Sequence, residues 1–171
     1  MGFDLSLSLP VHLLIHFSLA ILSALFFAFA FKQFYWPILA GLLGGFFIDL
    51  DHVLEYFFVF GLKFNLYEFL NGYQFLTSDK IWLVFHAWEY FPIILLLVYL
   101  LRKKKVLALF LLTLAFSGLV HLVSDSYINN YPLKNYSIIY RAYKNFSAPE
   151  LLRPHQWELN LKAKERLGLE K

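Results

Sequence analysis

Four long apolar segments alternate with short polar breaks, and this pattern predicts a bundle of membrane-spanning helices. At about 1.5 Å per residue, a helix of roughly 20 residues crosses a hydrocarbon core of about 30 Å. Helices are favoured there because every backbone polar group must be hydrogen-bonded internally in lipid. We therefore predict an all-α integral membrane four-helix bundle over residues 1–128. Its four segments cover about residues 10–31, 35–60, 81–101 and 106–128.

The chain changes character from residue 129 onward, where tyrosines recur at helical spacing among basic residues. Amphipathic segments of this kind tend to lie flat at the level of the lipid headgroups. Residues 154–171 have the pattern of a short solvated helix, which includes His155. We predict an interfacial and solvated helical tail over residues 129–171. The N-terminus lacks the positive region of a secretory signal, and we interpret the first apolar segment as a retained span.

The composition supports a membrane protein and narrows the possible chemistry. Hydrophobic residues make up 60% of the chain and charged residues 16%, far from the average of soluble domains. The chain has no cysteine, so a metal site must use His, Asp and Glu. The formal charge is +3, and no nucleic-acid motif is present. We expect membrane lipids, not nucleic acid, as the partner of the basic tail.

Ionisable side chains interrupt each apolar segment at a similar distance from a polar loop. We take Lys32–Gln33 and Arg102–Lys105 as two loops on one membrane face. Four side chains each lie 16 positions from the nearest end of these loops. A helix of that length rises about 24 Å, so we predict that the four converge in one layer near the opposite face. They are His16, Asp49, His86 and His121, one from each segment.

A second set of polar residues lies one helical turn from the first and shares its faces. Residues three or four apart are neighbours on a helix surface, so each segment presents a pair of polar side chains. The pairs are His12 with His16, Asp49 with His52, His86 with Glu89, and His121 with Asp125. Asp51 shares this face only if the backbone loosens, which the preceding Gly-Gly pair makes possible. We interpret Glu55 as an interfacial charge.

A bound cation is the simplest compensation for so many buried ionisable groups. Each costs roughly 2.5–3.5 kcal/mol in the hydrocarbon, so the uncompensated set would exceed the stability of a typical domain. One intramembrane histidine alone is more often a helix contact, but the shared depth favours ligands. Imidazole and carboxylate together suit Zn²⁺, Mn²⁺ or Fe²⁺, as one ion or two. The candidate ligands are His12, His16, Asp49, His52, His86, His121 and Asp125.

Two motifs are similar to those of a known family. Residues 48–52, IDLDH, match a Leu-Pro-Asp-x-Asp-His motif, and His121 with Asp125 matches a late His-x-x-x-Asp motif. With an early histidine, residues 10–128 resemble the membrane-bound metal-dependent hydrolases, a family that includes a LexA-regulated protein of the bacterial inner membrane. The resemblance implies a metal site in a prokaryotic inner or plasma membrane. The chain departs at Ile48, and residues 86–89, HAWE, replace a His-Arg-Gly-x-Thr-His-Ser stretch.

These observations favour an integral-membrane metal-dependent hydrolase. A metal in the site would activate water and polarise the scissile group, and Glu89 or Asp51 is the predicted general base. The depth of the site suggests a lipidic or membrane-delivered substrate, and we expect a phosphoester. Three basic residues of the tail are placed to meet its phosphate. They are Lys134, Arg141 and Lys144.

Two other functions use similar residues, and the orientation depends on charge. A metal or proton transporter also needs intramembrane His and Asp, but the halves of the segments nearest Lys32 and Arg102 are almost purely apolar. A non-enzymatic protein with a structural metal would have a closed, fully ligated site. The run Arg102–Lys105 favours a cytoplasmic loop and hence a site on the outer side. The basic residues of the tail favour the opposite orientation.

Overall fold

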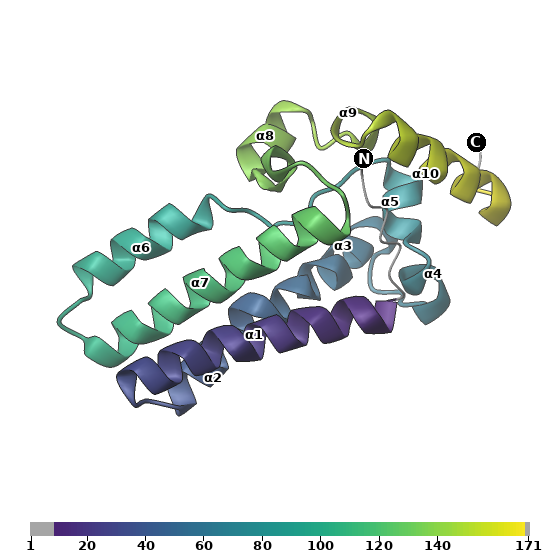
Figure 1. The fold of residues 1–171 in the computed structure, drawn as a ribbon. Helices are drawn as coiled ribbons and strands as arrows, with labels where there is room; N and C mark the ends of the chain where they lie inside the picture. The colour runs from purple at the N-terminus through teal and green to yellow at the C-terminus, as the bar shows by residue number, and fades with distance from the viewer. Residues whose placement is uncertain (1–8, 170–171) are drawn as a thin grey trace. The chain divides into compact units, whose positions relative to one another are not determined.

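All the regular secondary structure in the described residues, 9–169 of this computed structural model, is helical, which confirms the all-α class. The long and medium helices are α1 (Leu9–Phe31), α2 (Tyr35–Gly45), α3 (Leu50–Phe60), α6 (Tyr90–Leu100), α7 (Lys105–Ile128) and α10 (Pro154–Leu167) (Figure 1). The short ones are η1 (Phe47–Asp49), α4 (Leu66–Leu70), α5 (Tyr73–Ser78), η2 (Leu133–Tyr136), α8 (Ile138–Tyr143) and α9 (Ala148–Leu151). An isolated antiparallel bridge joins Lys80 and Ser147.

The described chain divides into two compact units, each made of two stretches of sequence. Unit 1 consists of residues 9–48 and 87–133, and therefore contains α1, α2, α6 and α7. Unit 2 consists of residues 49–86 and 134–169, with α3, α4, α5, α8, α9 and α10. Residues 49–86 are predicted to belong to the bundle, whereas the contacts group them with the C-terminal segment.

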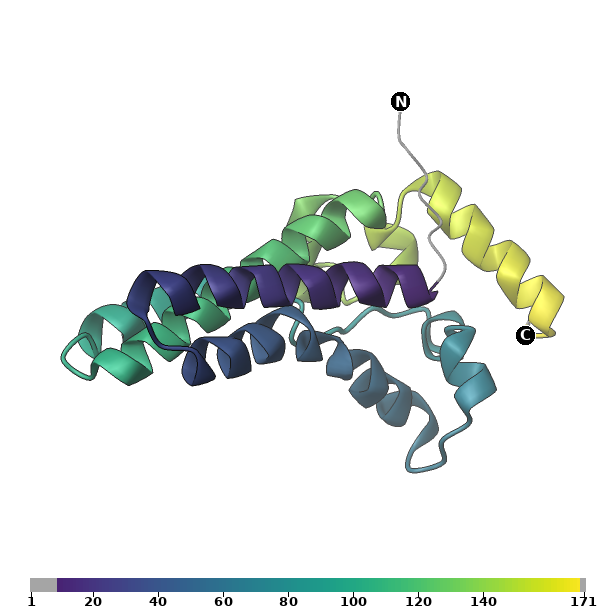
Figure 2. The same ribbon diagram turned by 60° about the horizontal axis from the view of Figure 1, so that its bottom comes forward.

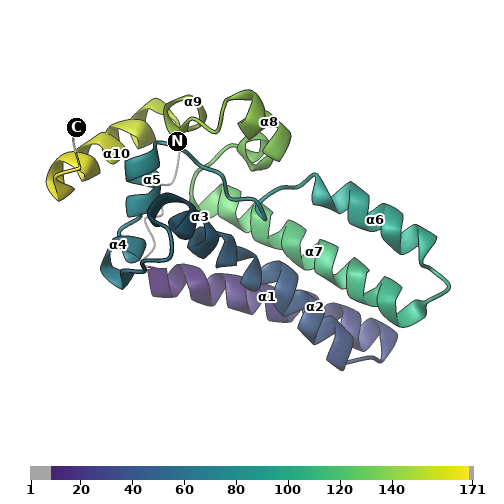
Figure 3. The ribbon, with the colours of Figure 1, turned by 180° about the vertical axis from the view of Figure 1, so that it is seen from behind.

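Helices α1, α2 and α7 of unit 1 pack closely because small residues line their contacts. A Cβ atom added to Gly41 would lie 2.6 Å from the Cβ of Ala24 in α1. A Cβ atom added to Gly44 would overlap the carbonyl oxygen of Leu114 in α7. Small residues allow such close approach of helix backbones in membrane proteins. Figure 2 shows α1 and α2 as neighbours joined by a short turn, and Figure 3 shows α6 and α7 running alongside each other.

Two helices of the described chain are long and apolar enough to cross a membrane. They are Pro10–Phe31, with a mean hydropathy of 2.3, and Lys105–Ile128, with 2.4. The count rises to three if α2 and the helical stretch Phe47–Phe60 form one broken span. The protein therefore has the features of a membrane protein, but the predicted bundle of four spans is not confirmed.

The predicted third span, about residues 81–101, is wrong in its first half. Residues 81–89 form no regular helix, and α6 covers only Tyr90–Leu100. Its 11 residues rise roughly 16 Å, well short of a hydrocarbon core. The backbone N–H groups of Trp82, Leu83, Phe85 and His86 instead donate to side-chain carboxylates of α3. Because these groups have acceptors outside a helix, the segment stays extended and bent.

The second apolar segment is also interrupted, at the place where the sequence has its Gly-Gly pair. Helix α2 ends at Gly45, one turn of 3₁₀ helix follows, and α3 begins at Leu50. Phe46 leaves helical geometry, with φ −127° and ψ −49°. The loosening that the glycines make possible is therefore present just before Asp49 and Asp51.

The C-terminal segment of unit 2 is tied to residues 79–81 by backbone hydrogen bonds. The N–H of Ile81 donates to the Phe146 carbonyl at 2.9 Å, and the N–H of Ala148 donates to the Asp79 carbonyl at 2.8 Å. Arg141 of α8 is 1% exposed, and its guanidinium donates to the Leu83 carbonyl at 3.0 Å. The prediction that Arg141 faces phosphate at the membrane surface is therefore wrong, because its charge is buried against the backbone.

Candidate metal centres

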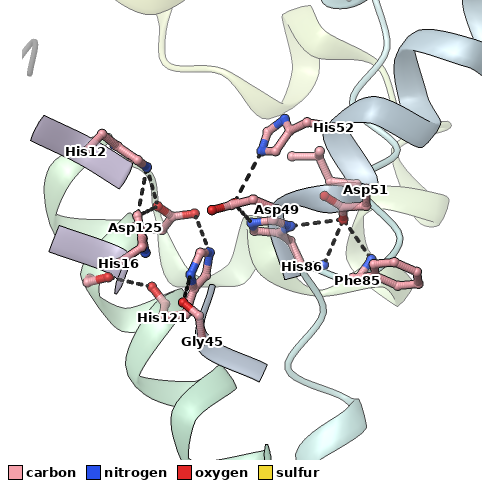
Figure 4. A network of polar contacts seen from close by, with 12 residues as sticks. His12, His16, Gly45, Asp49, Asp51, His52, Phe85, His86, His121 and Asp125 are labelled. Atoms are coloured by element: carbon pink, nitrogen blue, oxygen red, sulfur yellow. Dashed lines mark hydrogen bonds and ion pairs between the residues drawn. The ribbon is translucent and has the colours of Figure 1, made fainter. Parts of the chain in front are cut away.

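Unit 1 brings four predicted ligands together from two long helices. His12 and His16 lie one turn apart on α1, and His121 and Asp125 lie one turn apart on α7. The Nε2 atoms of His12 and His16 are 3.3 Å and 3.1 Å from Asp125 Oδ1. The two Nε2 atoms are 2.8 Å apart. Figure 4 shows the three side chains pointing toward one another. We call His12, His16 and Asp125 the unit 1 triad.

The unit 1 triad has the spacing expected of ligands around one small cation. A Zn²⁺ ion with ligands at about 2.0–2.1 Å in tetrahedral geometry keeps them roughly 3.3 Å apart. The three atoms of the triad lie 2.8, 3.1 and 3.3 Å from one another. His16 is 0% exposed and Asp125 is 4% exposed. Two imidazoles and a carboxylate form a donor set that suits Zn²⁺, Mn²⁺ or Fe²⁺.

His121 lies beside the triad and is oriented by the end of α2. Its Nδ1 donates to the Gly45 carbonyl at 3.0 Å, and this is one of the last carbonyls of a helix, which lack intrahelical partners. With the proton on Nδ1, Nε2 carries a lone pair. That Nε2 is 3.6 Å from Asp125 Oδ2. The His121 and His16 rings lie 4.0 Å apart between centroids.

The packing of unit 1 places these histidines. Gly45 has no room for a side chain, because an added Cβ would lie 2.8 Å from the Ala20 Cβ and would overlap Ser117 Oγ. Ala20 lies one turn from His16 on α1, and Ser117 lies one turn from His121 on α7. The small residues that bring α1, α2 and α7 together therefore also set the distance between the two histidine-bearing helices.

Unit 2 holds a second group, Asp49, His52 and His86, which we call the unit 2 triad. Asp49 ends the 3₁₀ turn, His52 lies in the first turn of α3, and His86 belongs to the segment before α6. His86 Nε2 is 3.2 Å from Asp49 Oδ1, and His52 Nε2 is 3.8 Å from the same oxygen. One ligand atom from each residue lies within 4.8 Å of the others. His86 is 0% exposed.

Asp51 forms a hydrogen bond with His86 of the unit 2 triad, through the ring nitrogen that does not face Asp49. Its Oδ2 accepts a hydrogen bond from His86 Nδ1 at 2.9 Å, which fixes the ring and directs Nε2 toward Asp49. The same oxygen accepts from the N–H groups of Phe85 at 2.8 Å and of His86 at 3.3 Å. Metal-binding histidines commonly donate their second ring N–H to a carboxylate in this way. Asp51 is thus placed to orient a ligand.

Glu55 continues the same arrangement one helical turn later. Its Oε1 accepts from the Trp82 N–H at 2.8 Å and its Oε2 accepts from the Leu83 N–H at 3.2 Å. Glu55 is 1% exposed, so its interpretation as an interfacial charge is wrong. Its carboxylate is compensated by backbone donors, as buried charges require. The i, i+4 spacing of Asp51 and Glu55 is visible in the sequence, but the backbone N–H groups that they bind cannot be predicted from it.

Glu89 has a different place from the one predicted. It is the residue before α6, half-buried, and it does not share a helical face with His86 because no helix joins them. Among the described residues, the groups with metal-ligand spacing do not include Glu89. His155 lies in α10 and is exposed.

Comparison of the chain with protein-family models, curated proteins and solved structures found no match. The interpretation of the two triads as metal sites therefore rests on their interatomic distances and ligand types.

Proposed function

We propose that the protein is an integral-membrane, metal-dependent hydrolase. One observation carries this proposal: the three ligand atoms of the unit 1 triad lie 2.8–3.3 Å from one another, and two of the three residues, His16 and Asp125, are buried. Three protein ligands that leave a further position open are typical of catalytic metal sites, whereas structural sites are closed by four. A lipidic or membrane-delivered phosphoester is the substrate class that fits helices of this hydropathy.

The residues of the two triads and their neighbours have different roles in the proposal. His12, His16 and Asp125 would hold one divalent ion, and the unit 2 triad would hold another. When bound, such an ion activates water as a nucleophile and withdraws electron density from a phosphoryl oxygen. His121 keeps its proton on Nδ1 through the Gly45 carbonyl, so its Nε2 carries the lone pair with which it would accept a proton or bind an ion. Asp51 is a positioning residue for His86. Glu89 remains a predicted general base.

Metal analysis of the purified full-length protein tests the metal part of the proposal. We expect up to two ions per chain after loading with Zn²⁺ or Mn²⁺, and fewer in His16→Ala. His155→Ala is the matched control, because it removes an exposed histidine outside both triads. A wild-type protein that binds no ion after loading, or equal loss in His16→Ala and His155→Ala, would contradict the proposal.

Activity assays separate hydrolysis from the other uses of a metal site. The wild type should release phosphate or an alcohol from phospholipids or small phosphoesters only with metal, and a chelator should stop the reaction. Transport would instead appear as metal flux into proteoliposomes without hydrolysis. Two buried hydroxyls of α7 argue against a polar path, because Thr113 donates to the Leu109 carbonyl and Ser117 to the Gly41 carbonyl. Bound metal with neither activity would leave a structural role.

A further inference from the structure

We propose that the turn between α6 and α7 is a binding site for an anionic phospholipid. This inference is independent of the hydrolase proposal, and it concerns a cavity of about 550 Å³ within unit 1. The cavity has a basic part and an apolar part. It is lined by Trp36, Lys103, Lys104, Lys105, Val106, Leu107 and Phe110.

The basic part of the cavity has no counter-charge of its own. Lys103, Lys104 and Lys105 are exposed, and no acidic residue lines the cavity. Within residues 9–169, none of the three lysines forms an ion pair with a carboxylate. The neighbouring Arg102 differs, because it donates to the Tyr99 carbonyl at 3.1 Å and stacks on that ring. Three uncompensated cations at one turn attract an anionic ligand.

The start of α7 adds to this attraction. The helix begins at Lys105 and runs for 24 residues. Its first N–H groups have no intrahelical acceptors, and its dipole places a partial positive charge at this end. Helix N-termini bind phosphate for these reasons. Here the helix end reinforces a cavity that already carries three lysines.

The apolar part of the cavity indicates a lipid and not a soluble phosphate compound. Trp36 and Phe110 meet edge to face with ring centroids 6.3 Å apart, and Val106 and Leu107 continue this wall. A soluble phosphate ester would leave the wall in water. A phospholipid would cover it with glycerol and acyl carbons while its phosphate meets the lysines. Burial of apolar surface then adds to the ionic attraction.

The cavity also lies at the right depth for a headgroup. Lys105 is the first residue of the candidate span Lys105–Ile128, so the lysines lie where this helix leaves the hydrocarbon. Tryptophan is enriched at this level, and cationic residues next to a span attract anionic lipids of the cytoplasmic leaflet. Charge, shape and depth therefore favour one occupant, a phospholipid with net negative charge.

Native mass spectrometry of the full-length protein in detergent tests the proposal. Phosphatidylglycerol should bind at one saturable site at least about tenfold more tightly than phosphatidylcholine. The K103Q/K104Q/K105Q variant should bind phosphatidylglycerol roughly 100-fold more weakly, because each lysine contributes about a factor of five. The control K63Q/K162Q/R166Q removes the same charge from exposed residues of unit 2 and should bind as the wild type.

Two further measurements keep the proposal falsifiable if the triple variant does not fold. Lys104→Gln alone should weaken binding several-fold, and Trp36→Leu should weaken binding of both lipids while keeping the preference for phosphatidylglycerol. Glycerol 3-phosphate at millimolar concentration should not displace the lipid. Equal loss in the lysine and control variants, unchanged binding in the lysine variants, or displacement by glycerol 3-phosphate would overturn it.

Discussion

The two triads use the same kinds of ligand but are held in place by different means. In unit 1, His12, His16 and Asp125 project from two long helices whose separation is set by small residues at the contact with α2. In unit 2, His86 belongs to a segment without regular helix that is fixed by carboxylates of α3. The ligand atoms lie 2.8–3.3 Å apart in unit 1, whereas in unit 2 the Oδ1 atom of Asp49 lies 3.2 Å from His86 Nε2 and 3.8 Å from His52 Nε2.

The two sites therefore depend on different interactions. Unit 1 depends on helix packing, so a change in the packing surface should disturb its ligands. Unit 2 depends on hydrogen bonds from backbone N–H groups to Asp51 and Glu55, so loss of a carboxylate should disturb its ligands. The following variants test this contrast.

The largest effect is expected for Asp125→Asn. This change removes the anionic ligand that contacts both histidines of the unit 1 triad, so metal affinity there should fall at least roughly 100-fold. Metal content per chain should decrease from two ions to one, measured by elemental analysis after loading. The double variant with His86→Ala should retain none. If Asp125→Asn alone removes both ions, the two triads are not independent sites.

Gly44→Ala should destabilise unit 1 by about 3 kcal/mol, at the upper end of overpacking costs. The added Cβ meets a backbone oxygen of α7, which cannot move as a side chain does. Thermal unfolding in detergent measures the effect. Ala30→Val, which adds volume at an exposed position of α1, should leave the melting temperature unchanged. Equal melting temperatures for both variants would contradict the packing account.

Asp51→Asn should weaken metal binding in unit 2 by about 10–100-fold, the usual effect of losing a supporting carboxylate. The amide keeps the shape but no longer presents a charged acceptor to the three donors around it. Chelator competition measures the affinity. The unit 1 ion serves as the internal reference and should stay bound. A variant that binds both ions normally would show that Asp51 does not orient a ligand.

The smallest effect is expected for Glu55→Gln. Each carboxylate oxygen accepts one backbone N–H, and the amide keeps only one good acceptor, a loss of about 1 kcal/mol. Hydrogen exchange at Trp82 and Leu83 should be roughly fivefold faster, read from a peptide that covers residues 80–86. Glu158→Gln, which removes an exposed ion pair with Lys162, should not change that peptide. Equal exchange in all three proteins would exclude a role for Glu55 in fixing the segment.

The same contrast explains what the sequence predicts. Helices α1 and α7 follow from long apolar runs, and the i, i+4 pairs on them follow from helical periodicity. Residues 81–89 are largely apolar, as the candidate spans of this chain are. The helix prediction fails there because Asp51 and Glu55 accept hydrogen bonds from backbone N–H groups of this segment. Because every residue except proline has a backbone N–H group, the residue types of this segment do not indicate these hydrogen bonds.

The burial of two charged side chains also differs from the prediction, for a related reason. Glu55 and Arg141 look like surface residues because their sequence neighbours include polar or interfacial groups, yet each is 1% exposed and bonded to backbone of residues 82–83. A side chain that is satisfied by main-chain atoms needs no complementary residue type. Hydrogen bonds to main-chain atoms leave no pattern of residue types, so they could not be predicted from the sequence.

The acceptor that orients His121 is a main-chain oxygen of Gly45. Every amino acid carries that atom, so no single exchange of one residue for another can delete it. A histidine oriented by a carboxylate loses its acceptor when one residue is substituted, as at Asp51. A single mutation can therefore remove the acceptor of His86 directly, whereas the acceptor of His121 is lost only if the end of α2 moves.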